Sequence, residues 1–198
     1  MRAHYNALYW GIITVLVVCS SFFTYRVVTF KKGLTAGAGD IRVASGDTVT
    51  FVKAIDGDEI AVQAGDANFV VRILGIKAFD PTVNDPQMAG IAARAVAFLD
   101  RRLSGRRPSL EFSAFKTDRR KRVLAYVVVE GEDLGRQMVA EGLALVYTLY
   151  PFDRMVRYQE IEDRARKEKI GLWGNPVAVE RADLLKVIWE QEQEKSDV

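Results

Sequence analysis

Residues 47–74, DTVTFVKAIDGDEIAVQAGDANFVVRIL, form three runs rich in valine, isoleucine and phenylalanine, separated by glycine and aspartate. The three runs lie at 47–54, 59–64 and 68–74. The candidate turns between them lie at 56–58 and 65–66. β-Branched and aromatic residues favour strands, and Gly and Asp are typical of tight turns. The stretch therefore predicts three consecutive strands joined by short turns.

Two more strands and three helices are predicted after this stretch. Valine-rich and leucine-rich runs predict strands at 110–115 and 122–130. Apolar residues recur at spacings of three and four between the third and fourth strands, and they are Met88, Ile91, Ala92, Ala95 and Leu99. This spacing predicts an amphipathic helix, and further helices are predicted at 134–141 and 154–169. Such an order favours a small α+β barrel over a parallel α/β sheet.

The composition excludes several kinds of catalytic site. The 198 residues contain one cysteine, Cys19, and one histidine, His4, both near the N-terminus. An intramolecular disulfide, a Ser-His-Asp triad and a His/Cys zinc cluster are therefore excluded from the folded region. Carboxylates, arginines, lysines and a hard metal ion remain. With 49% hydrophobic and 27% charged residues, the chain fits one modest domain with an appendage.

The net charge of +2 is unevenly distributed along the chain. Residues 1–32 hold four basic residues and no acidic one, whereas residues 33–175 hold 21 basic and 20 acidic residues. Because a nucleic-acid-binding domain usually carries a basic surplus, nucleic acid is a possible partner but not the favoured one. Local patches, such as Lys116 with the basic run at 119–122, could still contact a phosphate backbone.

An uncharged stretch, ALYWGIITVLVVCSSFFTY, occupies residues 7–25. As a helix it would be about 28 Å long, which matches the hydrocarbon core of a bilayer. We therefore expect a single-pass membrane protein whose anchor is retained, and we favour this reading over a cleaved signal peptide. Arg2 opposes Arg26 and the lysines at 31–32, so the side of the membrane that holds the remaining chain stays open.

Four segments are expected along the chain. They are a transmembrane anchor at 1–32, a linker with the lead-in to the first strand at 33–46, a folded domain at 47–175 and an amphipathic helical tail at 176–198. The apolar residues expected on one face of the tail helix are Leu184, Leu185, Ile188 and Trp189. This face is expected to pack on the domain, and docking on a partner protein is the alternative.

Several short fragments of the chain together form a pattern that is typical of a known domain family. The opening fragments are AIDGD at 54–58 and VRILGI at 71–76. The later fragments are Thr117-Asp118 with Arg122, LAYV at 124–127, Asp133-Leu134, GLA at 142–144, Val146-Tyr147, Ala165-Arg166 and GLW at 171–173. In this order and spacing, from about Thr48 to Trp173, they resemble the staphylococcal-nuclease-like, or thermonuclease, domain family. The resemblance implies a five-stranded OB-fold barrel with about three helices.

The resemblance also implies a set of site residues. In active family members, a calcium ion is held by the second aspartate of the Asp-Gly-Asp turn, by an aspartate after the arginine-bearing strand and by the next residue's carbonyl. Two arginines bind the phosphate, and a glutamate orients or deprotonates the attacking water. Carried over to this sequence, the metal ligand is Asp58, the phosphate-binding arginines are Arg72 and Arg122, and the residue in the glutamate's position is Asp80.

Lys77 is the main departure from the family pattern, because it stands where the second calcium aspartate is expected. The exchange removes an attraction and adds a repulsion, each roughly 4 kcal/mol for charges about 4 Å apart at an effective dielectric near 20. The shorter Asp80 also moves its carboxylate by about one methylene, and a displacement of about 1 Å can cost around a hundredfold in rate. An ion pair between Lys77 and Asp58 is expected instead, with no cofactor, or calcium if the site is active.

Two functions follow from these observations. The favoured one is a membrane-anchored, catalytically impaired domain that serves as a binding or structural subunit of a membrane complex. Its expected partners are the lipid bilayer and membrane proteins that contact the anchor or the tail helix. The alternative is a calcium-dependent nuclease that cleaves DNA or RNA, with Asp58 on the metal, Arg72 and Arg122 on the phosphate and Asp80 as the base.

Overall fold

The computed structural model describes residues 10, 13–22, 24, 43–80, 85–114, 116–118 and 122–196. Most of the predicted linker, the two ends of the predicted anchor and the basic residues at 119–121 lie outside the described residues.

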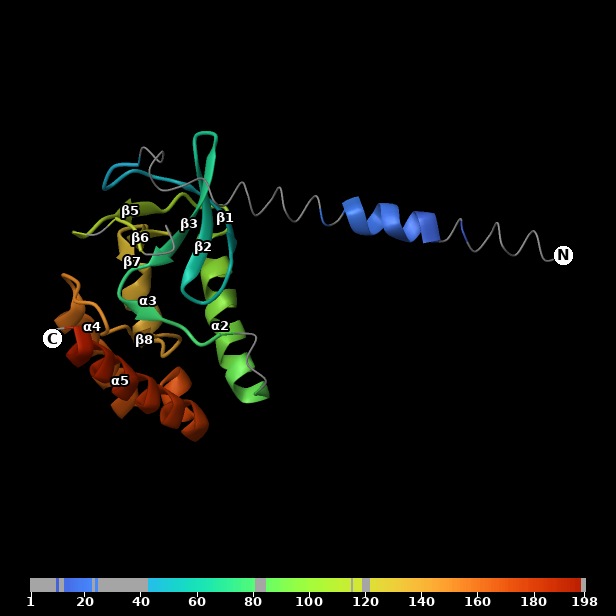
Figure 1. The fold of residues 1–198 in the computed structure, drawn as a ribbon. Helices are drawn as coiled ribbons and strands as arrows, with labels where there is room; N and C mark the ends of the chain where they lie inside the picture. The colour runs from blue at the N-terminus through green and yellow to red at the C-terminus, as the bar shows by residue number, and fades with distance from the viewer. Residues whose placement is uncertain are drawn as a thin grey trace.

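The main sheet runs in the order β1-β2-β3-β6-β5 (Figure 1). Its strands are β1 Thr50–Ala54, β2 Glu59–Ala64, β3 Ala67–Ile73, β5 Ser109–Glu111 and β6 Val123–Val129. Strands β1, β2 and β3 are antiparallel neighbours, β6 pairs with β3 in parallel, and β5 is antiparallel to β6. The short strand β7 (Glu132–Asp133) pairs with β6, while β4 (Ile76–Lys77) and β8 (Leu145–Val146) form a separate pair.

Helices cover the sheet and its ends. They are α2 Pro86–Leu103, α3 Leu134–Ala140, α4 Met155–Lys167, the 3-10 turn η1 Gly171–Gly174 and α5 Pro176–Ser196. Helix α2 begins where the side chain of Asp85 accepts hydrogen bonds from the backbone N–H groups of Gln87 and Met88, which satisfies free donors of the first turn. All five apolar residues that predicted this helix are buried, so its amphipathic pattern is confirmed.

The mixed sheet curves as a half-barrel with several helices around it, and this confirms the predicted α+β class. Backbone hydrogen bonds also connect the two ends of the sheet: the N–H of Gly46 donates to Leu110 and that of Val49 donates to Pro108, both at 2.8 Å. Buried side chains from the sheet, α2, α3 and α4 form the main core. A second buried cluster lies among α2, η1 and α5.

The predicted membrane span is corrected by the structure. Residues 13–22, which lie within the predicted span, are helical. Among the residues that the structure describes, no helix is long and apolar enough to cross a membrane. This finding contradicts the predicted single-pass membrane localisation.

Helix α5 packs on its own domain, as expected. Ala178, Ala182 and Trp189 are buried in the second cluster. Lys186 also forms an ion pair with Glu162 of α4, whose side chain is 2% exposed. The helix is therefore fixed to the domain by both apolar and charged contacts.

The predicted face of α5 is wrong in part. Leu184 and Ile188 are exposed, whereas the smaller Ala178 and Ala182 make the buried contact. Small side chains allow a helix to approach its neighbour closely. The prediction considered only large apolar residues, so it missed these alanines. Docking of this helix on a partner protein stays a prediction.

Candidate functional site

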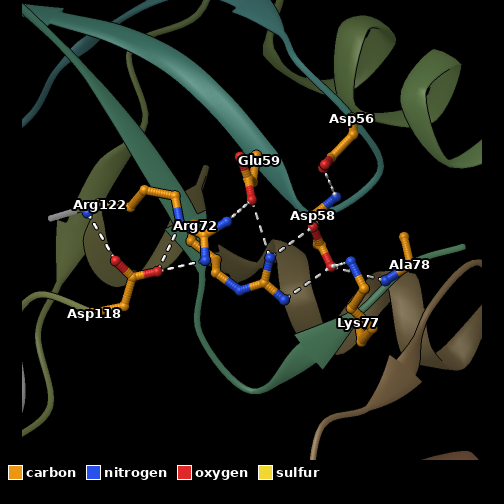
Figure 2. A network of polar contacts seen from close by, with 8 residues as sticks. All are labelled: Asp56, Asp58, Glu59, Arg72, Lys77, Ala78, Asp118 and Arg122. Atoms are coloured by element: carbon orange, nitrogen blue, oxygen red, sulfur yellow. Dashed lines mark hydrogen bonds and ion pairs between the residues drawn. The ribbon is translucent and has the colours of Figure 1, made fainter. Parts of the chain in front are cut away.

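A cluster of charged side chains lies where the β1–β2 turn, β3, β4 and the segment before β6 meet (Figure 2). Glu59 is the first residue of β2 and pairs with Arg72 of β3. The parallel pairing of β3 with β6 brings Arg122, which directly precedes β6, to the same place. Because side chains alternate along a strand, Val71 and Ile73 point into the core and Arg72 points into the cluster.

Asp58 is the central carboxylate of this cluster, and its side chain has no exposed surface. Arg72 binds it with two nitrogens, Nη1 to Oδ1 at 3.1 Å and Nη2 to Oδ2 at 3.2 Å. Oδ2 also accepts a hydrogen bond from the backbone N–H of Ala78 at 3.0 Å and forms an ion pair with Lys77 Nζ at 3.1 Å. Asp58 is therefore a buried, fully paired anion, as a charge at this depth must be.

Glu59 connects the two arginines. Its Oε1 accepts hydrogen bonds from Nη1 of Arg72, at 3.1 Å, and from Nη1 of Arg122. Arg122 in turn donates from Nε to Oδ2 of Asp118 at 2.6 Å. Burial lowers the pKa of Arg122, but the hydrogen bond to Asp118 and the charge of Glu59 outweigh this effect and raise it overall. Glu59 thus holds both guanidinium groups at one point.

Asp56 adds a third carboxylate beside Asp58 and Glu59. Burial, and then the negative charge of Asp58, raise the pKa of Asp56 to about 7. Its Oδ1 accepts a hydrogen bond from the backbone N–H of Asp58 at 2.9 Å. Near neutral pH this carboxyl group is therefore partly protonated, while its neighbours are paired with cations.

Gly57 allows the Asp-Gly-Asp turn to lie against the residues that complete the site. A Cβ atom at this position would lie 2.5 Å from Cβ of Ala78 and 2.8 Å from Cβ of Ala95. Both alanines are buried. The turn can approach β4 and α2 this closely only because residue 57 has no side chain.

Replacing Gly57 with alanine is expected to lower the free energy of unfolding by about 1–3 kcal/mol, the usual cost of overpacking a core. Urea denaturation of the full chain measures this. Gly90→Ala is the matched control, since a Cβ at Gly90 would meet nothing within 4 Å. It is expected to leave the stability unchanged or raise it by about 0.5–1 kcal/mol. An equal response in the two variants would contradict the close approach at Gly57.

The structure brings four of the five predicted site residues into one network: Asp58, Arg72, Lys77 and Arg122. The side chain of Lys77 turns toward Asp58 and keeps 34% of its surface exposed. The expected ion pair between Lys77 and Asp58 is therefore present. The fifth residue, Asp80, is exposed and lies two positions beyond Ala78. Its role as a base stays a prediction.

Three members of the cluster were not expected as site residues: Asp56, Glu59 and Asp118. Glu59 follows Asp58 directly, and its importance comes from the strand register that sets it opposite Arg72. Asp118 precedes Arg122 by four residues and accepts from both its backbone N–H and its side chain. The single acidic residue just before the basic run at 119–122 is a signal that could have identified Asp118, whereas the acidic stretch at 56–59 holds no comparable signal for Glu59.

Tyr147 links the site to the C-terminal helix. Its ring centroid lies 5.8 Å from the guanidinium carbon of Arg72 and 4.9 Å from the ring centroid of Trp189 in α5. Burial is the main cause that raises the pKa of the Tyr147 hydroxyl. The aromatic pair therefore forms an apolar wall beside Arg72.

Within the part of the chain that the structure describes, Asp56, Asp58 and Glu59 form a group that could offer ligand atoms to a metal, with carboxylate oxygens within 4.8 Å of one another. Calcium takes six to eight oxygen ligands, and here Asp58 and Glu59 are already engaged by cationic side chains. The ammonium of Lys77 lies on the same carboxylate that a calcium ion would need. The residues present therefore do not fit calcium.

The fold and the charged cluster define a half-barrel domain with helices around it, and comparison with known proteins identifies its family. Residues 70–175 match the family model described as Staphylococcal nuclease homologue. The match covers more than half of the chain, which therefore belongs to this family.

Two curated relatives carry nuclease names. The chain is 31% identical over 111 residues to "Probable endonuclease lcl3" of Botryotinia fuckeliana (strain B05.10), a match that covers 52% of this chain and 41% of that protein. It is 30% identical over 130 residues to "SPbeta prophage-derived endonuclease YokF" of Bacillus subtilis (strain 168), covering 63% of this chain and 43% of that protein. The matched region thus spans less than half the length of each relative.

These comparisons correct the favoured function. A catalytically impaired accessory subunit of a membrane complex was expected, whereas the family and the names of its relatives indicate a nuclease. The expectation relied on Lys77 as a sign of lost catalysis. A cation at the position that the resemblance assigns to a metal ligand argues against a metal, but it leaves in place Arg72 and Arg122, which the resemblance assigns to the phosphate.

Proposed function

We propose that this protein is a nuclease that hydrolyses phosphodiester bonds of DNA or RNA. The observation that carries the proposal is the convergence of Arg72 and Arg122 on Glu59 beside Asp58, in a chain of the Staphylococcal nuclease homologue family. Two guanidinium groups at one point match the oxygens of a single phosphate. The nuclease names of the relatives support the same function.

The chemistry requires charge stabilisation at phosphorus. A water oxygen forms a bond to phosphorus, and the bond from phosphorus to one ester oxygen breaks. The water gives up one proton to a base, for which Asp80 is the proposed group, and the departing oxygen gains one proton. Arg72 and Arg122 bind the non-bridging oxygens, where fixed cationic donors stabilise the charge of the transition state.

Glu59 occupies the place that the phosphate needs. It pairs with both arginines, whose side chains are only 11% and 19% exposed. A phosphodiester oxygen that binds Nη1 of Arg122 would have to replace this carboxylate there. The pairing of Glu59 with the arginines therefore opposes substrate binding, while it keeps the guanidinium groups in position.

Glu59→Gln is expected to tighten binding of a short single-stranded DNA roughly tenfold, because it removes a charge that competes directly with phosphate. Fluorescence anisotropy of labelled octathymidylate measures this. Glu132→Gln is the matched control, since Glu132 pairs with Arg136 at the surface and its replacement is expected to leave the affinity unchanged. Weaker binding by Glu59→Gln would show that Glu59 supports the arginines more than it competes with the ligand.

The proposed function is tested by incubating the full chain with end-labelled single-stranded DNA and RNA, with calcium and with a chelator. Shortened products are expected from the wild-type protein and not from the double variant Arg72→Met/Arg122→Met. Absence of products under every condition would refute the proposal. Equal products from the double variant would assign the cleavage to a contaminant and refute it as well.

A further inference from the structure

We propose that Lys77 supplies the positive charge that calcium is expected to supply, so that this site binds and cleaves a phosphodiester without a divalent cation. This inference rests on the proposed nuclease function and specifies its cofactor requirement. The three cations that would bind the phosphate are Lys77, Arg72 and Arg122, which all belong to one network (Figure 2).

The position of the Lys77 ammonium is the first observation that opposes a metal ion at this site. Lys77 Nζ lies 3.1 Å from Oδ2 of Asp58, the carboxylate that the family resemblance assigns to calcium. The same oxygen accepts from Arg72 at 3.2 Å and from the N–H of Ala78 at 3.0 Å. With three donors on Oδ2 and Arg72 on Oδ1, a metal would have to displace existing partners of Asp58. Lys77 would then repel it.

The charge balance of the network is the second observation that opposes a metal ion at this site. Three carboxylates, those of Asp58, Glu59 and Asp118, pair with three cations. These six side chains therefore sum to no net charge before any ion is added, and Asp56 beside them adds no positive charge. Lys77→Asp would change this sum by two units, from +1 to −1 at one position, which equals the charge of one calcium ion.

The exposed fraction of the Lys77 side chain is the third observation, and it concerns access to a phosphate. Among the three cations, the side chain of Lys77 is the most exposed, at 34%, against 11% for Arg72 and 19% for Arg122. An ammonium has three N–H donors on a flexible stem. It can keep its contact with Asp58 and donate another hydrogen bond to a phosphate oxygen. A fixed positive charge at this point stabilises developing negative charge in the same way that a metal ion does.

The experiment uses the full chain as wild type, Lys77→Asp and Lys77→Met, with Lys167→Met as the control. Lys167 is exposed at the end of α4 and lies outside the network. Calcium binding is measured by isothermal titration with calcium chloride. Octathymidylate binding and cleavage of single-stranded DNA are measured with chelator and with calcium.

We expect the wild type and Lys167→Met to bind octathymidylate and cleave DNA equally with chelator and with calcium. Lys77→Met is expected to lose affinity for octathymidylate about tenfold or more in chelator, the usual weight of a charged hydrogen bond. Lys77→Asp is expected to bind one calcium ion and to cleave only when calcium is present.

The inference is overturned if the wild type binds calcium saturably and loses cleavage in chelator, a result that leaves the proposed nuclease function intact. Wild-type protein that cleaves nothing refutes the nuclease function. The octathymidylate titration then still decides the role of Lys77, because unchanged affinity of Lys77→Met in chelator overturns it. Urea denaturation shows whether each variant is folded, and Lys77→Asp serves as a second test if Lys77→Met is not.

Discussion

Replacing Asp58 with alanine is expected to lower the free energy of unfolding by about 3–5 kcal/mol, because it removes one partner of a buried ion pair and leaves the other charged. Asp58 has no exposed side-chain surface and pairs with both Arg72 and Lys77. Arg72 is 11% exposed, so little water can replace the lost carboxylate. The N–H of Ala78 also loses its acceptor.

Asp183→Ala is the matched control for this prediction. Asp183 also binds an arginine through both oxygens, at 2.6 Å and 2.8 Å from Arg166, but its side chain is 45% exposed. Exposed pairs contribute under about 1 kcal/mol. Urea denaturation of the two variants of the full chain compares them directly. A loss at Asp58 no larger than that at Asp183 would mean that Asp58 is solvated or unpaired in solution.

The second large effect is expected in catalysis. Arg122→Met should lower kcat/KM for cleavage of single-stranded DNA roughly 10²–10³-fold, the usual cost of removing one donor to the charge of a transition state. Arg122→Lys should recover only part of this loss, because an ammonium keeps the charge but lacks the planar fork. The measurement is initial cleavage rate against substrate concentration, which separates effects on kcat from effects on KM.

Arg136→Met controls for the loss of an ion pair as such. Arg122 pairs with Asp118 and Arg136 pairs with Glu132, each four residues apart in sequence. Arg136 lies outside the network and its replacement is expected to leave kcat/KM within about twofold of the wild type, since a surface pair has little weight. Cleavage by Arg122→Met at the wild-type rate would remove Arg122 from the proposed mechanism.

Local patterns were sufficient to predict the longer elements of the fold. Strand β2 covers the predicted residues 59–64, and β3 lies one residue earlier than predicted. The two-residue strands β4, β7 and β8 were not predicted, because two residues show no alternation. Strand β5 ends at Glu111, short of the predicted 115, since the apolar residues after it do not continue the pairing with β6.

The site was predicted as far as single positions could be matched to a family pattern. Asp58, Arg72 and Arg122 meet as expected, and Lys77 lies on the carboxylate of Asp58. The role of Glu59 could not be predicted in this way. It depends on the β2–β3 register and on the parallel pairing of β3 with β6, which bring together residues 63 positions apart in sequence. Long-range pairing of this kind leaves no local signal.

The contacts of α5 have a practical consequence for anyone who shortens the gene. A fragment cut at the limits of the family match, 70–175, would discard the turn that bears Asp58 and Glu59. It would also discard Trp189, which rests against Tyr147 beside Arg72. Such a truncation would expose apolar aromatic surface to water. An inactive or aggregating preparation of that fragment would be an artefact of the cloning boundary, with no bearing on whether the intact protein cuts nucleic acid.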